Sequence, residues 1–234
     1  CWTGDGFRGR PVPWHRPRVH AFRLVGFRDL DIAGACADGD TTWARFAPVD
    51  EEGELVGVET NWLTTNRAPA WLRAEVPRLG GRVAPAPAAP TRVRERQCAK
   101  TWLPGAGGTR YTHALGTSLE LVPLDDPARD GELRVRLLSA GQPVAGAPLR
   151  AWRQPEGPDD LPLSPAARDS LPPVVQTRTN AAGEATLELK GRGEFLLAAG
   201  LVRACADTSA AALEILRATF TFARPGTPGP SGSR

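Results

Sequence analysis

The stretch Glu132-Leu-Arg-Val-Arg-Leu-Leu138 decides the fold class, together with the similar stretch Glu184-Ala-Thr-Leu-Glu-Leu189. In the first, Leu133, Val135 and Leu137 alternate with arginine, and the second alternates apolar and polar residues in the same way. Successive side chains of a β-strand point to opposite faces, so this period of two predicts strands with one buried face.

Turn residues separate these strands. Gly141, Gly146 and the cluster at 180–183 are typical of the turns that join antiparallel strands. An apolar segment at 194–199 is predicted to be a central strand. The region 132–222 is therefore predicted to form a small antiparallel β-sandwich, and its sequence contains no evident catalytic group.

The composition limits the functional classes. The chain has 234 residues, of which 41% are hydrophobic and 24% charged, which is ordinary for a soluble globular protein. The formal charge is only +3 and no basic block is present, so the sequence argues against a nucleic-acid partner. No apolar run approaches the roughly 20 residues that a membrane-spanning helix needs.

The N-terminal residues predict a lipid anchor. The sequence contains no Met and begins at Cys1, as a processed bacterial lipoprotein does. We therefore expect lipid on Cys1, an extracytoplasmic location and attachment to a membrane by acyl chains. Residues 1–18 are expected to form an extended arm, whose Trp2 and Trp14 pack on the folded domain, lie at the lipid interface or contact a partner protein.

Three further cysteines allow one disulfide and leave one thiol over. The pairs Cys36–Cys98 and Cys98–Cys205 are both possible, and buried unpaired thiols are the alternative. Strand alternation places Arg94 and Arg96 on the same face as Cys98, where they could lower its pKa. No histidine or acid is placed by the sequence to complete a catalytic dyad, so we expect no enzyme activity and no catalytic residue.

The first half of the chain also contains strand patterns. Strands are predicted at residues 19–25, at 54–60 and at 92–103, where the segment is highly charged and a helix is the competing interpretation. Residues 61–73 are interpreted as a strand followed by a turn.

The sequence contains candidate residues for two kinds of ligand site, a metal site and a carbohydrate-binding surface. His20 could bind a metal ion with Asp29, Asp31 or Cys36, although an ordinary strand histidine is the simpler interpretation and the other histidines, His15 and His113, are scattered. No cofactor is expected. A carbohydrate-binding surface would need exposed tryptophans as stacking platforms, and the candidates for it are Trp43, Trp62, Trp71 and Trp152.

Several segments resemble an uncharacterised family of bacterial periplasmic proteins, a domain of unknown function with a transthyretin- or carboxypeptidase-regulatory-like β-sandwich. The family has segments that read "ERY..YAK", "LG.pLEivPl.dP", "dGkPlagA.V", "TDadGra" and "HdFWl". The corresponding segments here are Arg94-Glu-Arg-Gln-Cys-Ala-Lys100, Leu115-Gly-Thr-Ser-Leu-Glu-Leu-Val-Pro-Leu-Asp-Asp-Pro127, Gly141-Gln-Pro-Val-Ala-Gly-Ala-Pro-Leu149, Thr179-Asn-Ala-Ala-Gly-Glu-Ala185 and His20-Ala-Phe22. The chain departs from the pattern at Gln97 and Cys98, where aromatic residues are usual, and at Arg23, where Trp is expected.

The resemblance implies tandem β-sandwich domains in the cell envelope, and members of the family are often associated with cobalt or nickel uptake. We therefore expect an all-β chain of two tandem antiparallel Ig- or transthyretin-like sandwiches, with an extended N-terminal arm and a C-terminal tail. The expected boundaries are 1–18 for the arm, 19–114 and 115–223 for the two domains, and 224–234 for the tail.

The expected function is that of a non-enzymatic, lipid-anchored envelope protein that acts as an accessory or structural subunit of a membrane-associated complex. Its expected partners are the membrane, through the lipid on Cys1, and other protein subunits, with Trp2 and Trp14 as contacts. The alternatives are a periplasmic nickel- or cobalt-uptake accessory protein that binds metal near His20, and a carbohydrate-binding module.

Overall fold

A computed structural model describes residues 2–3, 10–11, 14–35, 39, 52–82, 88–105, 108–154, 166–167 and 170–224. The described chain is mainly β-strand, which confirms the predicted all-β class. The strands are β1 (Trp2–Thr3), β2 (Arg10–Pro11), β3 (Val19–Val25), β4 (Asp29–Asp31), β5 (Gly53–Thr60), β6 (Leu63–Arg67), β7 (Thr91–Pro104), β8 (Glu120–Pro123), β9 (Gly131–Ser139), β10 (Gln142–Pro143), β11 (Pro148–Gln154), β12 (Val175–Arg178), β13 (Glu184–Leu189), β14 (Gly193–Ala204) and β15 (Leu213–Arg224). The helical elements are α1 (Pro69–Arg78) and three 3-10 turns, Arg16–Arg18, Ala33–Ala35 and Arg110–Thr112. Within the described ranges no helix has the length and apolar character needed to cross a membrane.

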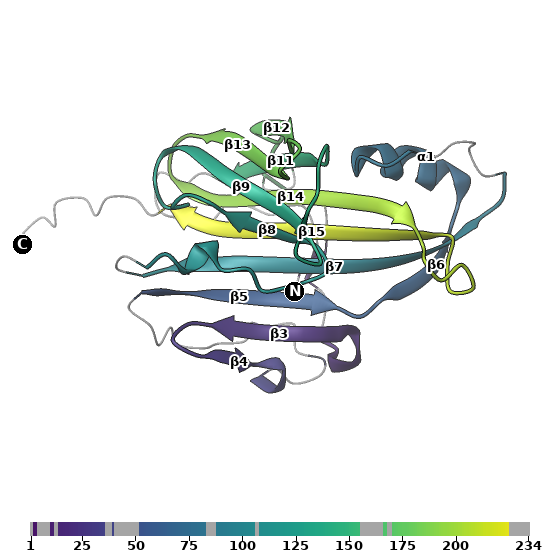
Figure 1. Cartoon of the computed structure of the whole chain (residues 1–234), viewed down its shortest axis with the longest axis horizontal. Coiled ribbons are helices and arrows are strands. Elements are labelled where there is room, and N and C mark those ends of the chain that lie inside the picture. The colour runs from purple at the N-terminus through teal and green to yellow at the C-terminus, as the bar shows by residue number, and fades with distance from the viewer. Residues whose placement is uncertain are drawn as a thin grey trace, which may run out of the picture.

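Two sheets organise the fold (Figure 1). The large sheet has nine strands in the order β12-β11-β14-β15-β7-β5-β3-β4, and β6 pairs with β7 outside this path. The small sheet has the order β10-β9-β13, and β8 pairs with β9. In these two sheets β7 and β15 run parallel to each other, whereas the other described pairs are antiparallel.

The main core lies between the small sheet and one face of the large sheet, a sandwich-like arrangement. Leu133 and Leu137 of β9 and Leu187 of β13 are fully buried there, as their alternation predicts. They pack in one cluster with Phe195 of β14 and Phe220 of β15. Burial of each such side chain contributes about 1.5–3 kcal/mol to folding, so this apolar layer holds the two sheets together.

The large sheet joins the two regions that were predicted to be separate domains. β7 lies in the predicted first domain and β15 in the predicted second, yet they are paired from Val93 opposite Leu213 to Thr101 opposite Thr221. The expected pair of tandem Ig-like sandwiches is therefore not confirmed. Periodicity identifies strands and their buried faces, but it does not identify the partner of a strand that lies over a hundred residues away.

The segment predicted as a strand followed by a turn contains β6 and then the helix α1. Pro69 occupies the first helical turn, where its missing N–H costs nothing and its fixed φ favours the helix. Leu72 and Val76 are four residues apart, so they lie on one helix face, and both are fully buried against Val93 of β7. The turn predicted at the end of the segment 61–73 was wrong, because α1 begins at Pro69.

The predicted strands at 19–25, 54–60 and 92–103 correspond to β3, β5 and β7. On the face of β3 and β5 that the small sheet does not cover, Trp14 and Phe22 form a second apolar cluster with Val19 and Ala33. The ring centroids of Trp14 and Phe22 are 5.1 Å apart, and the indole is 7% exposed. The end of the predicted N-terminal arm therefore belongs to the folded protein.

We predict that Leu187→Ala lowers the free energy of unfolding by about 2–5 kcal/mol, because the substitution leaves a cavity between the sheets. Urea denaturation should show one transition by tryptophan fluorescence and by circular dichroism, since both sheets share this core. The control Glu188→Ala changes the next residue, whose side chain is exposed, and should shift stability by less than about 0.5 kcal/mol. Two separate transitions would contradict the single core.

Candidate functional site

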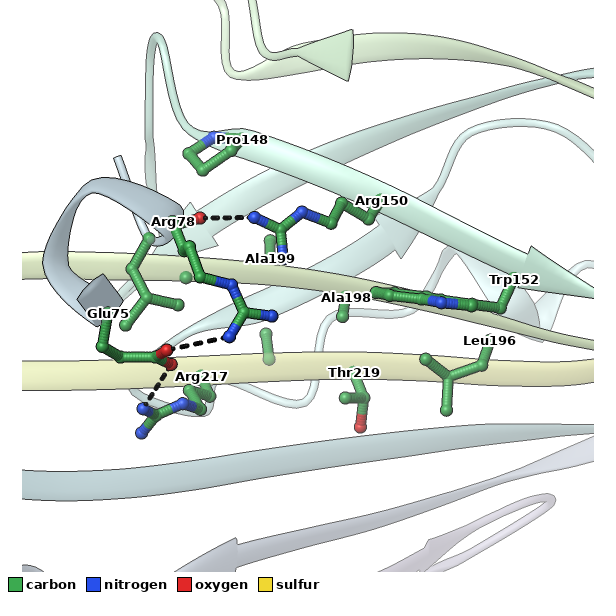
Figure 2. A pocket seen from close by; sticks show the side chains of 13 residues that line it. Glu75, Arg78, Pro148, Arg150, Trp152, Leu196, Ala198, Ala199, Arg217 and Thr219 are labelled. Carbon is green, nitrogen blue, oxygen red and sulfur yellow. Dashed lines mark hydrogen bonds and ion pairs between the residues drawn. The ribbon is translucent and has the colours of Figure 1, made fainter. Parts of the chain in front are cut away.

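An open groove of about 110 Å³ lies on the face of the large sheet opposite the small sheet (Figure 2). β11, β14 and β15 supply its floor and the C-terminal part of α1 supplies one wall. Register places Arg150, Ala198 and Thr219 in one cross-strand row, with Trp152 opposite Leu196 in the next row of that face. The small side chain at position 198 leaves depth between the helix and the indole.

Glycine allows α1 to approach the sheet at this groove. A Cβ at Gly200 would lie 2.3 Å from a methyl carbon of Leu79, just after the helix. Gly80 has a φ of +80°, and a Cβ there would lie 2.5 Å from Pro148 on β11. Both positions therefore require glycine if the end of α1 is to sit where it forms the groove wall.

Ion pairs connect the helix to the sheet across the groove. Glu75 accepts hydrogen bonds from Arg78 at 3.1 Å and from Arg217 at 2.9 Å. Arg217 also donates to Glu95 on β7 at 2.7 Å. Arg150 donates to the backbone carbonyl of Arg78 at 3.2 Å. The wall of the groove is thus held by charge-assisted hydrogen bonds, and it contains more arginine than carboxylate.

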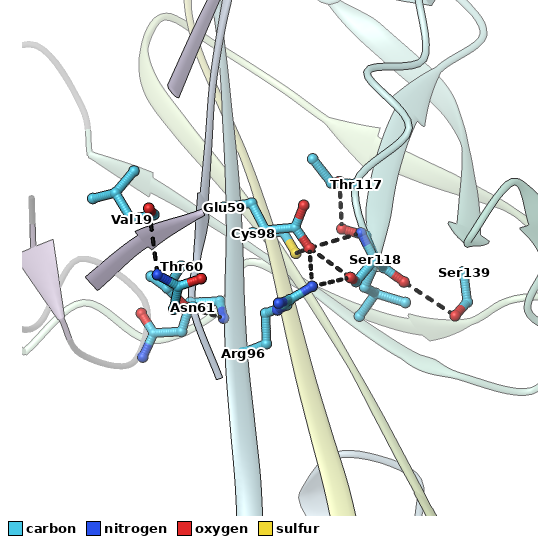
Figure 3. A network of polar contacts seen from close by, with 11 residues as sticks. Val19, Glu59, Thr60, Asn61, Arg96, Cys98, Thr117, Ser118 and Ser139 are labelled. Atoms are coloured by element: carbon cyan, nitrogen blue, oxygen red, sulfur yellow. Dashed lines mark hydrogen bonds and ion pairs between the residues drawn. The ribbon is translucent and has the colours of Figure 1, made fainter. Parts of the chain in front are cut away.

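A second group of polar residues is buried between the sheets (Figure 3). Glu59 of β5 is 5% exposed, and its Oε1 accepts hydrogen bonds from Arg96 at 3.1 Å and from the backbone N–H and the hydroxyl of Ser118. The carbonyl of Ser118 in turn accepts a hydrogen bond from Ser139 of β9 at 3.1 Å. This chain of contacts joins the large sheet to the small sheet through the loop before β8.

Lys100 and Glu120 form a neighbouring ion pair, with both side chains 3% exposed and 2.8 Å between Nζ and Oε1. Glu120 also accepts the backbone N–H groups of Leu115 at 2.7 Å and Gly116 at 3.0 Å. Burial lowers the pKa of Lys100, and the adjacent carboxylate opposes that shift. Lys100 lies in the segment 94–100 and Glu120 in the segment 115–127, so two of the segments that resemble the family meet in this ion pair.

Cys98 lies in the same region as a buried, free thiol. Its Sγ is 3.9 Å from Oε1 of Glu59. Burial raises the pKa of Cys98 to about 11, which the nearby carboxylate reinforces and Arg96 opposes. The thiolate is the nucleophilic form, so this environment makes Cys98 unreactive at neutral pH, contrary to the lowering that its arginine neighbours suggested.

The predicted disulfide Cys98–Cys205 is not formed, because both thiols are free. Cys98 lies opposite Ala218, whereas the backbone of Cys205 bonds to Ala212, six residues away along the chain. At about 3.3 Å per residue the two thiols are much too far apart to bond. Because Cys98 is free, a Cys36–Cys98 bridge is not formed either. Cys1 lies outside the described residues, so lipid attachment stays a prediction.

The structure describes His20, Asp29 and Asp31 of the candidate metal site, and it gives both aspartates other partners. The side chain of His20 is exposed at an irregularity in the pairing of β3 with β5. Asp29 is instead bound by Arg23, and Asp31 accepts a backbone N–H from the following 3-10 turn. Within the described ranges no three His, Cys, Asp or Glu side chains form a group that could hold a metal ion. Metal binding near His20 stays a prediction.

Four of the singled-out tryptophans have partners within the fold. Trp14 is buried in the apolar cluster described above, so in this fold it is a core residue and not an exposed partner contact. Trp62 lies beneath the guanidinium groups of Arg94 and Arg96, each 4.5 Å from the ring centroid. Trp71 stacks with Arg67, also at 4.5 Å, and Trp152, 5% exposed, ends the groove. The side chain of Trp2 and all of Trp43 lie outside the described part of the chain.

Sequence reasoning missed the buried carboxylates and the groove. Glu120 could have been found, because it is an acid within the apolar segment from Leu119 to Val122 and a buried acid needs a buried partner. Glu59 lies near the end of the alternating strand β5, and no neighbouring apolar run indicates that its carboxylate is buried. The groove exists because the end of α1 packs beside Arg150 of β11, and no local sequence pattern indicates this tertiary contact.

Substitution of Lys100 by Met should lower the free energy of unfolding by about 3–5 kcal/mol, because it leaves the Glu120 carboxylate buried without its cation. Adding Glu120→Gln removes that charge, so the double variant should be more stable than Lys100→Met alone. Chemical denaturation of both variants gives the values. A double variant that is less stable than the single variant would contradict a buried ion pair.

Cys98 should resist iodoacetamide at pH 8 in the folded protein and react in urea, as peptide mass spectrometry would show. Between about pH 9 and 11 the unfolded thiol loses its proton while the folded thiol keeps it, so the stability contributed by this group falls as the pH rises through that window. Rapid alkylation of folded Cys98 at pH 8 would be inconsistent with this environment. Cys98→Ser removes the thiol and is the control.

A family model described as "Domain of unknown function (DUF4198)" matches residues 35–203, which is more than half of the chain. No curated protein and no solved structure matches this chain. The matched range contains all strands from β5 to β13 and most of β14, together with α1 and the buried pairs Lys100–Glu120 and Arg96–Glu59. The chain therefore belongs to the DUF4198 family, a family whose function is unknown.

Proposed function

We propose that this chain is an accessory subunit that binds another protein in a bacterial cell envelope and does not itself catalyse a reaction. The envelope location follows the family resemblance. The binding surface we assign is the hairpin tip, residues 26–31, which comprises the turn after β3 and the strand β4 at the outer edge of the large sheet (Figure 1).

The observation that supports the proposal is the exposure of apolar side chains at the hairpin tip. Phe27 is 84% exposed and Leu30 is 46% exposed. Aromatic residues are enriched among the residues that dominate protein–protein binding. β4 is also the last strand of the large sheet in the described structure, and strand edges are common places for another chain to bind.

The hairpin tip is held in place before any partner binds. Arg23 pairs with Asp29 at its base, and this hydrogen-bonded contact lowers the pKa of Asp29. Arg23 also donates to the carbonyl of Leu115 at 2.6 Å, which connects the hairpin to the loop before β8. A rigid support reduces the entropy lost when a partner binds Phe27.

We expect Phe27→Ser to release the protein from its partners with little loss of stability, because the side chain contacts little of its own fold. The protein would be purified from native membranes in mild detergent, and co-migrating subunits would be identified for the wild type and the variant. Leu63→Ser is the matched control, since Leu63 is 59% exposed on β6, far along the large sheet.

The proposal predicts a stoichiometric complex for the wild type and for Leu63→Ser, and a free protein for Phe27→Ser. A wild-type protein that is a monodisperse monomer in native membranes would refute the accessory role. A complex that survives Phe27→Ser unchanged would refute the hairpin tip as the contact.

A further inference from the structure

The groove between α1 and Trp152 has the charge and shape of a site for a small anion, at a different place from the hairpin tip. We propose that it binds a small organic monocarboxylate, whose carboxylate lies against Arg150 and whose apolar body lies toward Leu196 and Trp152. The groove residues come from four elements that the ion pairs described above hold in fixed positions (Figure 2).

The helix side of the groove carries excess positive charge. Glu95 is shared by Arg67, at 2.7 Å, and Arg217, and Glu75 is shared by Arg217 and Arg78. Among the described residues, three guanidinium groups thus face two carboxylates on this side, and Arg150 adds a fourth cation. A bound anion would reduce this excess, whereas a cation would increase it.

Arg150 is the arginine best placed to bind the anion. A guanidinium group has five N–H donors, and the described structure gives Arg150 one hydrogen bond, to the carbonyl of Arg78, and no ion pair with a described carboxylate. It starts on β11 in the cross-strand row of Ala198, and its guanidinium extends toward the end of α1, where it meets the carbonyl of Arg78 at the charged end of the groove. A carboxylate can accept two parallel N–H bonds from such a group.

The size of the groove limits the ligand. An enclosed cavity of about 150 Å³ is enough for benzene, so an open groove of about 110 Å³ admits a carboxylate and much of one small ring, whose outer edge stays in solvent. Ala198 and Gly200, which carry little or no side chain, form the deep part of the floor, and Leu196 with Trp152 forms the apolar end. This division into a charged end and an apolar end is that of a small-molecule site.

Sodium benzoate is the probe, and benzyl alcohol is the uncharged molecule of similar shape. Titration of the wild-type protein, followed by amide and indole chemical shifts, should show benzoate binding that perturbs Ala198, Gly200 and the Trp152 indole. Arg150→Gln should weaken this binding by about tenfold or more, because a charge-assisted contact is lost. Arg150→Lys keeps the charge and should weaken it less.

The matched control is Arg153→Gln on the same strand, because Arg153 lies on the opposite face and donates to the backbone of Lys190. The Arg153→Gln variant should bind benzoate with the same affinity as the wild-type protein. Three results would each overturn the proposal: no benzoate binding up to about 10 mM, equal binding by Arg150→Gln and wild type, or binding of benzyl alcohol as tight as that of benzoate.

Discussion

Two buried carboxylates determine how this fold is assembled. Glu59 and Glu120 are almost inaccessible to water, and each binds a cationic side chain of β7. Glu59 also accepts one backbone N–H of the loop before β8, and Glu120 accepts two. A buried carboxylate is stable only when its partners are in place, so these bonds fix the path of that loop. Since β8 begins where the loop ends, the same bonds position the small sheet on the large one.

The consequence for function is an asymmetry between the two faces of the large sheet. One face is covered by the small sheet and forms the main core. The other face is covered only in part by the described residues, by α1 at one end and by the cluster around Trp14 at β3 and β5. The groove lies next to the helix on this second face, and the hairpin tip lies at the sheet's edge, so both surfaces depend on a scaffold that the buried polar contacts hold in position.

The sequence predicted the strands well and their partners poorly. Alternation at Leu133 to Leu137 and at Ala185 to Leu189 identified strands and their inward faces, because burial on one face imposes a period of two. Nothing local indicates that β7 pairs in parallel with β15, since that contact joins segments over a hundred residues apart. The helix α1 was missed because Pro69 is compatible with both a turn and a helix start.

The same distinction applies to the candidate sites. Residue types alone suggested Cys98, His20 and Trp14 as candidate site residues. Their roles depend on burial and on partners from other strands, and the fold makes Cys98 an inert thiol and Trp14 a core residue. Lys100 lies in the strand predicted at 92–103 and Glu120 in the segment 115–127 that resembles the family, while the contact between them came from tertiary structure alone. The sequence does not distinguish Arg150 from the other arginines, and only its contact with the end of α1 in the structure makes it a candidate binding residue.

Native-state hydrogen exchange at the backbone amides of Leu115 and Gly116 is the measurement that tests this account most directly. Both amides lie in a loop, yet each donates to the buried carboxylate of Glu120. The account predicts that they exchange only through global unfolding, with the same protection free energy as the amides of β7 and β15. Exchange of these two amides at the rates of an exposed loop would contradict it.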